Sequence, residues 1–380
     1  MSKNSRYLTS VLSITLGMRL FSMSIIIPFL SVYALNLKGG APWLTGYALG
    51  IFGLTQAVLQ IPFGVLSDRI GYKKVMVAGL LMLIAGLLTA AYAPSVYWLI
   101  FARALQGSGA IVTVGYSWIS SVASDETRDK KLTRLGAVLG TFTMLSYTIG
   151  PLIHIFLKVD RMFIFSAGLM VICLFWVLFG TKQVDPNMRR IHHQKRKGKT
   201  VFNRKTFMRG LLLTVNNLLM MAFFFILPIL LEGKLETRQM WMILTPAILV
   251  AMAFLTLFSR LASKSKAKPV MLFLYLLEGI GFLLLYGQSF PGIIAGTVLL
   301  MTGSFSVSTI VPMLLNRDID NEQRGTGNGI VVSLQYFGSF LGAAVTGSLW
   351  SISPDIAFLF TGIFSVLGVV LVLTFPQKKD

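Results

Sequence analysis

A few charged side chains interrupt otherwise apolar segments, and these residues are the candidates for binding ions or transferring protons. Arg19 and Arg103 lie inside two such segments, and Glu278 is the carboxylate inside a third. An arginine at such a position is costly and marks a functional site by default. The alternative is that each arginine only braces neighbouring helices through hydrogen bonds, for instance to backbone carbonyls. Burial favours the neutral form of Glu278, which makes it a candidate to bind and release a proton. His154 is a further titratable candidate.

The sequence contains few of the motifs that are typical of enzymes. We find no Gly-x-Ser-x-Gly nucleophile turn, no phosphate-binding loop and no metal-ligand spacing, and the adjacent His192 and His193 lack further ligands. The sequence therefore predicts neither an enzyme nor a bound cofactor or metal. A membrane-embedded enzyme, such as a lipid acyltransferase, is the rival class, and it would need a convergent catalytic cluster.

Composition places these residues in a membrane. The chain has 380 residues, of which 55% are hydrophobic and only 13% charged, whereas soluble domains carry about 25% charged residues. A membrane helix needs about 20 apolar residues, and twelve segments meet that requirement. We expect spans at 8–35, 44–65, 75–93, 96–122, 133–157, 162–181, 207–231, 239–260, 269–288, 291–315, 327–350 and 355–375.

The net charge of +20 is spread over short loops, so it does not predict nucleic-acid binding. If the N-terminus is cytoplasmic, 27 of the 34 Lys and Arg side chains fall in cytoplasmic loops and tails, and 5 fall outside. This asymmetry predicts that both termini are cytoplasmic and that the loops face anionic lipid headgroups. We expect a multi-pass protein of the cytoplasmic (inner) membrane.

The longest and most basic loop, 182–206, divides the spans into two sets of six. We therefore expect an all-α membrane protein with an N-terminal bundle at 1–181, a cytoplasmic linker at 182–206 and a C-terminal bundle at 207–380. The two halves share a repeated pattern, because a Gly-x-x-x-Gly pair occurs at Gly136 and Gly140 and again at Gly338 and Gly342. Such repeats place transporter binding sites at the interface between halves. We expect a monomer.

The loop after the second span carries the most specific pattern. Its residues Gly64, Asp68, Arg69, Gly71 and Lys73 follow the spacing of the signature loop between helices two and three of the major facilitator superfamily, which the chain resembles. The family usually has Arg or Lys directly after the second glycine, in a charge relay with an acid near the end of helix four. Tyr72 stands there, so Lys73 or Lys74 is expected to substitute.

Two further patterns extend the resemblance to the whole chain. Arg103, Gln106 and Gly107 look like the fourth-helix motif, whose Arg is thought to aid proton transfer. Gly150 and Pro151 match part of the fifth-helix motif of antiporters, from which the chain departs at Ser146 and His154. The chain looks most similar to bacterial twelve-helix drug:proton antiporters.

The resemblance implies the major facilitator fold of two pseudo-symmetric six-helix bundles, with helices 1, 4, 7 and 10 around a central cavity. It implies a transporter that uses the proton gradient to export small amphipathic compounds by alternating access. Uptake or facilitated passage of a nutrient, siderophore or lipid stays open. The polar and aromatic candidates for the substrate cavity are Arg19, Gln56, Gln106, Tyr147, Asn216, Asn217 and Gln335.

Overall fold

The computed structural model describes residues 3–181, 204–318 and 324–374. Regular structure within these ranges is helical, apart from one isolated bridge between Lys38 and Ser95. The first-half helices are α1 (Lys3–Ser24), α2 (Ile27–Leu35), α3 (Pro42–Ile70), α4 (Tyr72–Ala91), α5 (Val96–Ser108), α6 (Val112–Ser121), α7 (Asp125–Phe156) and α8 (Val159–Gly180).

The second-half helices are α10 (Arg204–Leu231), α11 (Trp241–Leu261), α12 (Ala267–Tyr286), α13 (Phe290–Asp318), α14 (Arg324–Trp350) and α15 (Pro354–Thr374). A short helix, η1 (Thr237–Gln239), precedes α11, and a π-helical turn, η2 (Ala262–Lys266), joins α11 to α12. Residues 182–203 of the predicted linker 182–206 lie outside the described residues, and α10 begins at Arg204.

Within the described ranges, twelve helical segments are long and apolar enough to cross a membrane, as predicted. Two of the predicted spans are not single helices. The span 8–35 is divided between α1 and α2 at Ile25 and Ile26, and α2 then begins with Pro28 in its first turn. The span 96–122 is divided between α5 and α6 at residues 109–111. Interrupted helices within a membrane leave backbone groups that need partners from neighbouring segments.

Burial separates central from peripheral helices. In α10, 89% of the most apolar 18-residue stretch is buried, against 33% in α15. Burial, and not hydropathy, marks α10 as central, because the α15 span has the higher mean hydropathy of the two, at 2.7 against 2.1. Peripheral helices expose large apolar side chains, such as Leu359 at 63% and Leu283 at 70%, as expected for surfaces that face lipid.

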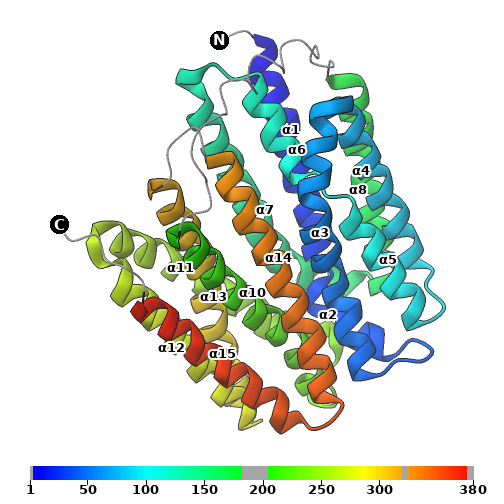
Figure 1. The fold of residues 1–380 in the computed structure, drawn as a ribbon. Helices are drawn as coiled ribbons and strands as arrows, with labels where there is room; N and C mark the ends of the chain where they lie inside the picture. Colours follow the sequence, from blue (N-terminus) through cyan, green and yellow to red (C-terminus); the bar gives the residue numbers. More distant parts are fainter. Residues whose placement is uncertain (1–2, 182–203, 319–323, 375–380) are drawn as a thin grey trace.

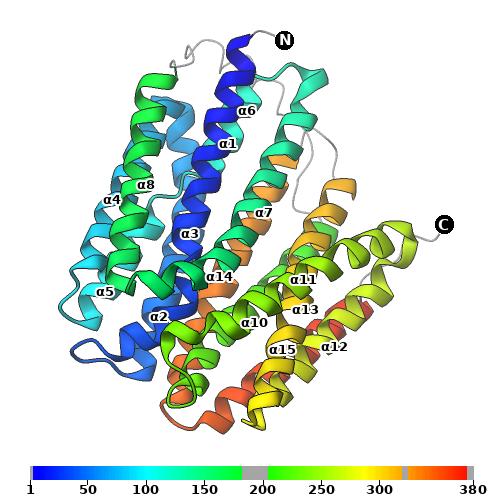
Figure 2. The same ribbon diagram turned by 180° about the vertical axis from the view of Figure 1, so that it is seen from behind.

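The helices form two groups, with α1–α8 on one side and α10–α15 on the other (Figures 1 and 2). We call the end of the molecule that holds the described chain ends Lys3 and Thr374 the termini side, and the other end the opposite side. The two groups diverge toward the termini side. On the opposite side α14 packs closely along α3, and it also packs on α10.

Glycines make this closure possible. A Cβ on Gly46 of α3 would lie 3.0 Å from the Gly347 Cα of α14, and one on Gly50 would lie 2.8 Å from the Phe340 carbonyl oxygen. Gly338 and Gly342 of α14 meet the α10 backbone at Thr214 and Leu218 in the same way. Small residues allow helix backbones to approach closely within a membrane. The structure is therefore a conformation that is closed on the opposite side.

Candidate functional site

The break between α5 and α6 exposes a backbone carbonyl to a buried arginine. Arg19 of α1 is fully buried, and its Nη2 donates to the Gly109 carbonyl at 3.1 Å and to Gln56 Oε1 at 2.6 Å. Gln56 Nε2 in turn donates to Gln60 Oε1 at 2.7 Å. Arg19 thus joins three first-half segments, α1, α3 and the interrupted α5–α6 span.

Arg19 is incompletely satisfied. Its Nε and Nη1 are buried without a hydrogen-bond partner among the described residues. Within the same ranges, no carboxylate pairs with Arg19. A guanidinium has five N–H donors and keeps its charge. The site therefore holds a buried positive charge, with the Tyr336 side chain beside the guanidinium and with Nε and Nη1 outside hydrogen-bond geometry, as a site that accepts an anion requires.

Arg103 has a more complete set of contacts. Its Nε donates to the Ala48 carbonyl at 3.3 Å and its Nη1 to Gln106 Oε1 at 2.7 Å. Gln106 Nε2 donates to the Gly86 carbonyl of α4 at 2.9 Å. Arg103 and Gln106 therefore bind α5 to α3 and α4. Of the two arginines, Arg19 has the freer donors.

A phenylalanine that the sequence analysis did not select links the two arginines. The Phe52 ring centroid lies 5.0 Å from Arg103 Cζ and 5.9 Å from Arg19 Cζ, within the range of cation–π attraction. Tyr336 of α14 meets Phe52 edge-on at 6.0 Å between ring centroids, and it also interacts electrostatically with Arg19. The signal that would have identified Phe52 is its position one helical turn before Gln56 on α3.

Aromatic side chains connect the two halves, and one of them, Tyr147, interacts electrostatically with Tyr336, as Arg19 does. Tyr147 of α7 stacks on Phe224 of α10 with ring centroids 5.1 Å apart, and Phe305 of α13 lies 5.6 Å from Tyr147. Ser31 of α2 donates to the Phe224 carbonyl at 3.4 Å. Tyr147 was selected from the sequence, and Phe305 was not. Stacked aromatic rings between the halves can bind an apolar ligand or close the passage between the halves.

The second-half candidates form two separate pairs. Asn216 Nδ2 donates to Ser308 Oγ at 2.9 Å, which leaves the Asn216 Oδ1 buried without a partner among the described residues. Gln335 Nε2 donates to Asn217 Oδ1 at 3.3 Å. These contacts join α10 to α13 and α10 to α14. The predicted cavity residues therefore lie on both sides of the interface between the halves.

The signature loop lies on the termini side, at the turn from α3 to α4. Gly71 has φ +111° and ψ 139°, a conformation that side chains rarely adopt. Tyr72 is buried, stacks on Trp118 at 6.3 Å and donates its hydroxyl to Asp68 Oδ1 at 3.0 Å. At the position where the family usually has a cation, Tyr72 therefore packs against Trp118 and binds Asp68 through its hydroxyl. Gly64 packs near Thr113 of α6, and Arg69 is exposed.

Lys73 does not take the expected place of that cation. Its Nζ donates to the carbonyls of Leu178 and Thr181 at 2.7 and 2.6 Å. A cation there stabilises the C-terminal end of α8. The family resemblance implies an acid partner for this cation near the end of the fourth span, where Asp125 and Glu126 are available. It also implies that Asp68 lies against the start of α14 near Gly327. The side chains of Asp125, Glu126 and the start of α14 are outside those that the structure describes.

Substitution of Asp68 tests this loop. We expect Asp68→Asn to shift the population further toward conformations open on the termini side and to lower transport without loss of folding. A carboxylate at a partly buried helix N-terminus contributes up to about 2 kcal/mol, roughly a 30-fold change in population. Spin labels at the exposed Lys74 and Ser263 report this opening as a longer distance. Unchanged transport and distance would remove Asp68 from the mechanism.

The antiporter-like residues lie on the opposite side. Gly150 meets α1 where that helix ends, because a Cβ would lie 2.8 Å from the Ile25 carbonyl oxygen. One turn beyond Pro151, the His154 ring stacks on Phe29 at 4.1 Å, and its Nδ1–H donates to the Leu157 carbonyl at 3.0 Å. His154 therefore contacts α2, beyond the end of α1, whereas Arg19 lies within α1.

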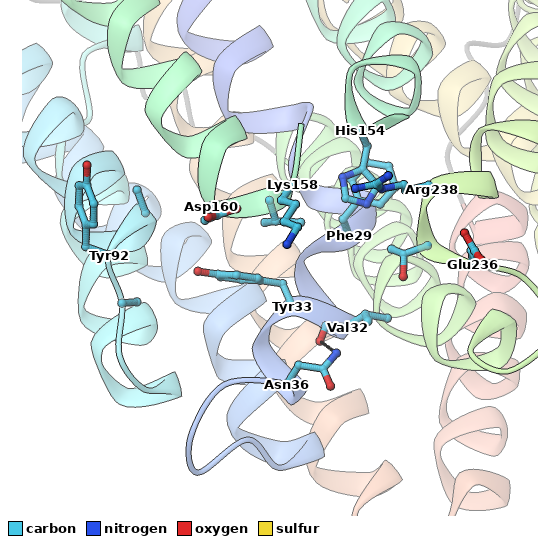
Figure 3. Close-up of a pocket in the computed structure, with 14 residues that line it drawn as sticks. Phe29, Val32, Tyr33, Asn36, Tyr92, His154, Lys158, Asp160, Glu236 and Arg238 are labelled. Carbon is cyan, nitrogen blue, oxygen red and sulfur yellow. Dashed lines mark hydrogen bonds between the residues drawn. The ribbon is translucent and has the colours of Figure 1, made fainter. Parts of the chain in front are cut away.

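His154 also lines an open cleft of about 840 Å³, to which both halves contribute residues. Figure 3 shows Lys158 and Tyr33 pointing into it, with the second-half residue Arg238 close to His154. The charged side chains around it balance in sign, since Lys158 and Arg238 are matched by Asp160 and Glu236. Residues of both halves line this cleft, so its shape changes when the contact between the halves rearranges.

Comparison with known proteins agrees with this architecture. The family model described as Major Facilitator Superfamily matches residues 12–251 and 211–380. The inner membrane transport protein YajR of Escherichia coli is 30% identical over 362 residues, which covers 92% of this chain and 78% of that protein. The multi-drug resistance efflux pump PmrA of Streptococcus pneumoniae is 31% identical over 171 residues, 40% of this chain and 41% of that protein.

Among solved structures, a bacterial homologue of the human lysosomal transporter Spinster, in an inward-facing and occupied conformation, superposes with a TM-score of 0.77. It is 12% identical, and the match covers 98% of this chain and 97% of that chain. A twelve-helix transporter is the class that these observations define. The chain belongs to the Major Facilitator Superfamily, as the signature loop and the helix count predicted.

Proposed function

We propose that the protein is a proton-driven exporter of small amphipathic compounds that are neutral, zwitterionic or anionic. The observation that carries this proposal is the buried Arg19, which has spare donors and no carboxylate partner among the described residues, at the interface between the halves. The rings of Tyr147, Phe224 and Phe305 supply an apolar surface, and Tyr336 interacts with both Tyr147 and Arg19. The similarity of part of the chain to a drug efflux pump supports export.

The distribution of positive charge indicates which side of the membrane the open end of the molecule faces. The distribution of Lys and Arg favours cytoplasmic termini, and the molecule is closed on the side opposite to them. With this orientation, the conformation faces the cytoplasm, where an exporter collects its substrate. Alternating access then requires the contact between α3 and α14 to open and the termini side to close.

We further propose that the protein works as a monomer, because one chain supplies both halves, and that the proton gradient replaces any bound cofactor as the energy source. Binding of substrate and of protons shifts the balance between the two conformations only by their differential affinity for each. Arg19 supplies such a difference for an anionic substrate, because its contact with Tyr336 crosses the interface that must rearrange.

Energised inside-out vesicles test the proposal. They should accumulate an amphipathic substrate, and addition of the substrate should release protons from the lumen. Dissipating the proton gradient with an ionophore is expected to abolish accumulation and to leave passive equilibration. Vesicles without the protein are the control. Accumulation that survives the ionophore would contradict proton drive, and accumulation only in right-side-out vesicles would indicate uptake.

A further inference from the structure

The proposed function leaves one buried acid without a role. Glu278 of α12 is fully buried and lies against α13, where Gly303 makes room for it. A Cβ on Gly303 would come within 2.8 Å of Glu278 Cγ and 3.4 Å of its Oε1. The fold therefore accommodates this carboxyl closely. Its helix α12 lies in the second group of helices, apart from α1, which carries Arg19 (Figures 1 and 2).

Neither carboxyl oxygen of Glu278 has a hydrogen-bond partner within the described ranges. Tyr275, which lies one turn earlier and interacts electrostatically with Glu278, donates its hydroxyl to the Leu212 carbonyl at 2.7 Å instead. An ionised carboxylate without partners in an apolar interior costs far more than folding can supply. In this conformation, Glu278 is therefore a neutral acid that carries a proton.

A small void lies beside the carboxyl. It measures about 10 Å³, close to the smallest space that holds one water molecule. Ser304 lines this void, and its hydroxyl also has no partner among the described residues. The other side chains that line it are apolar and come from α10 and α13: Leu219, Met220, Phe223, Leu300 and Met301.

The wall of this void connects Glu278 to the interface between the halves. Phe223 of α10 lines the void and packs edge-on against Phe224 at 5.2 Å between ring centroids. Phe224 stacks on Tyr147 of the first half. A movement of α10 that opens or closes the interface therefore changes the packing, and with it the access of water, around Glu278.

We propose that Glu278 is a proton-binding site of the second half, that it is occupied in this conformation, and that it releases its proton to water only when α10 and α13 separate. The step transfers one proton from the carboxylic acid to water and leaves a hydrated carboxylate. This inference rests on the proposed function, because it names the group through which the proton gradient acts.

Infrared spectroscopy of the purified full-length protein in liposomes tests occupancy directly. At pH 7 we expect the carbonyl band of a neutral carboxylic acid, which Glu278→Gln removes and Glu278→Asp shifts. Glu232→Gln, at an exposed position, is the matched control and should keep the band. If the band is absent from the wild type, or persists unchanged in both Glu278 variants, the inference is wrong.

Transport assays test coupling. Gln resembles the protonated acid in shape and charge, so Glu278→Gln is expected to keep substrate exchange across the membrane while proton-driven accumulation falls at least tenfold. Proton-driven accumulation that equals the wild type would overturn the role of Glu278 and leave the proposed function intact. If the wild type shows the infrared band but accumulates substrate equally with and without the proton gradient, the proposed function is wrong. The coupling role of Glu278 is then wrong as well.

Discussion

Arg19→Ala is expected to abolish transport of anionic substrates while transport of neutral ones persists. Two unit charges 4 Å apart interact by about 4 kcal/mol at an effective dielectric constant near 20, close to a thousandfold in affinity. Arg19 is buried and has no carboxylate partner among the described residues to offset its charge. The same field disfavours a cationic substrate. Competition assays with matched cationic and anionic amphiphiles measure the preference.

The alternative is that Arg19 only braces the first half through Gln56 and the Gly109 carbonyl. Gln56→Ala separates the two roles, because it removes one brace and keeps the charge. Under the alternative, Gln56→Ala and Arg19→Ala lower transport of all substrates in parallel. Arg19→Lys keeps the charge but loses the planar fork, so it should retain part of the preference for anions. A preference for lipophilic cations that is unaltered in Arg19→Ala would refute the electropositive site.

The second large effect is expected at the contact between α3 and α14. Gly46→Leu inserts a side chain where a Cβ already meets the Gly347 Cα at 3.0 Å. Overpacking of this kind costs about 1–3 kcal/mol, roughly a 5- to 150-fold shift between conformations. Because the cost falls on the conformation closed on the opposite side, we expect the variant to favour the open one and to lose most of its transport.

Spin labels at Tyr92 and Ile352 report this change, since the two residues belong to different halves on the opposite side and are 74% and 73% exposed. Gly46→Leu should lengthen the distance between the labels. Gly168→Leu is the matched control, because no atom lies within 4 Å of a Cβ at that exposed helix position. An unchanged distance together with normal transport would show that this contact does not close the molecule.

The sequence by itself determined the membrane class, the number of spans and the family. These properties depend on local features, namely the length of each apolar segment and the fixed spacing of Gly64, Asp68 and Gly71. Gly71 was identifiable because only glycine readily adopts its positive φ. The polar residues inside spans were also recognisable, since such residues are rare in an apolar segment and stand out individually.

Only the tertiary structure decided what those residues do. The partners of Arg19 lie 37 and 90 positions away, and the Gly109 carbonyl accepts a hydrogen bond because the helix is interrupted there. Lys73 binds the end of α8 at residues more than 100 positions away. Hydrogen-bond partners, unlike apolar length, depend on which backbone and side-chain groups the packed helices bring together, and no local pattern in the sequence contains that information.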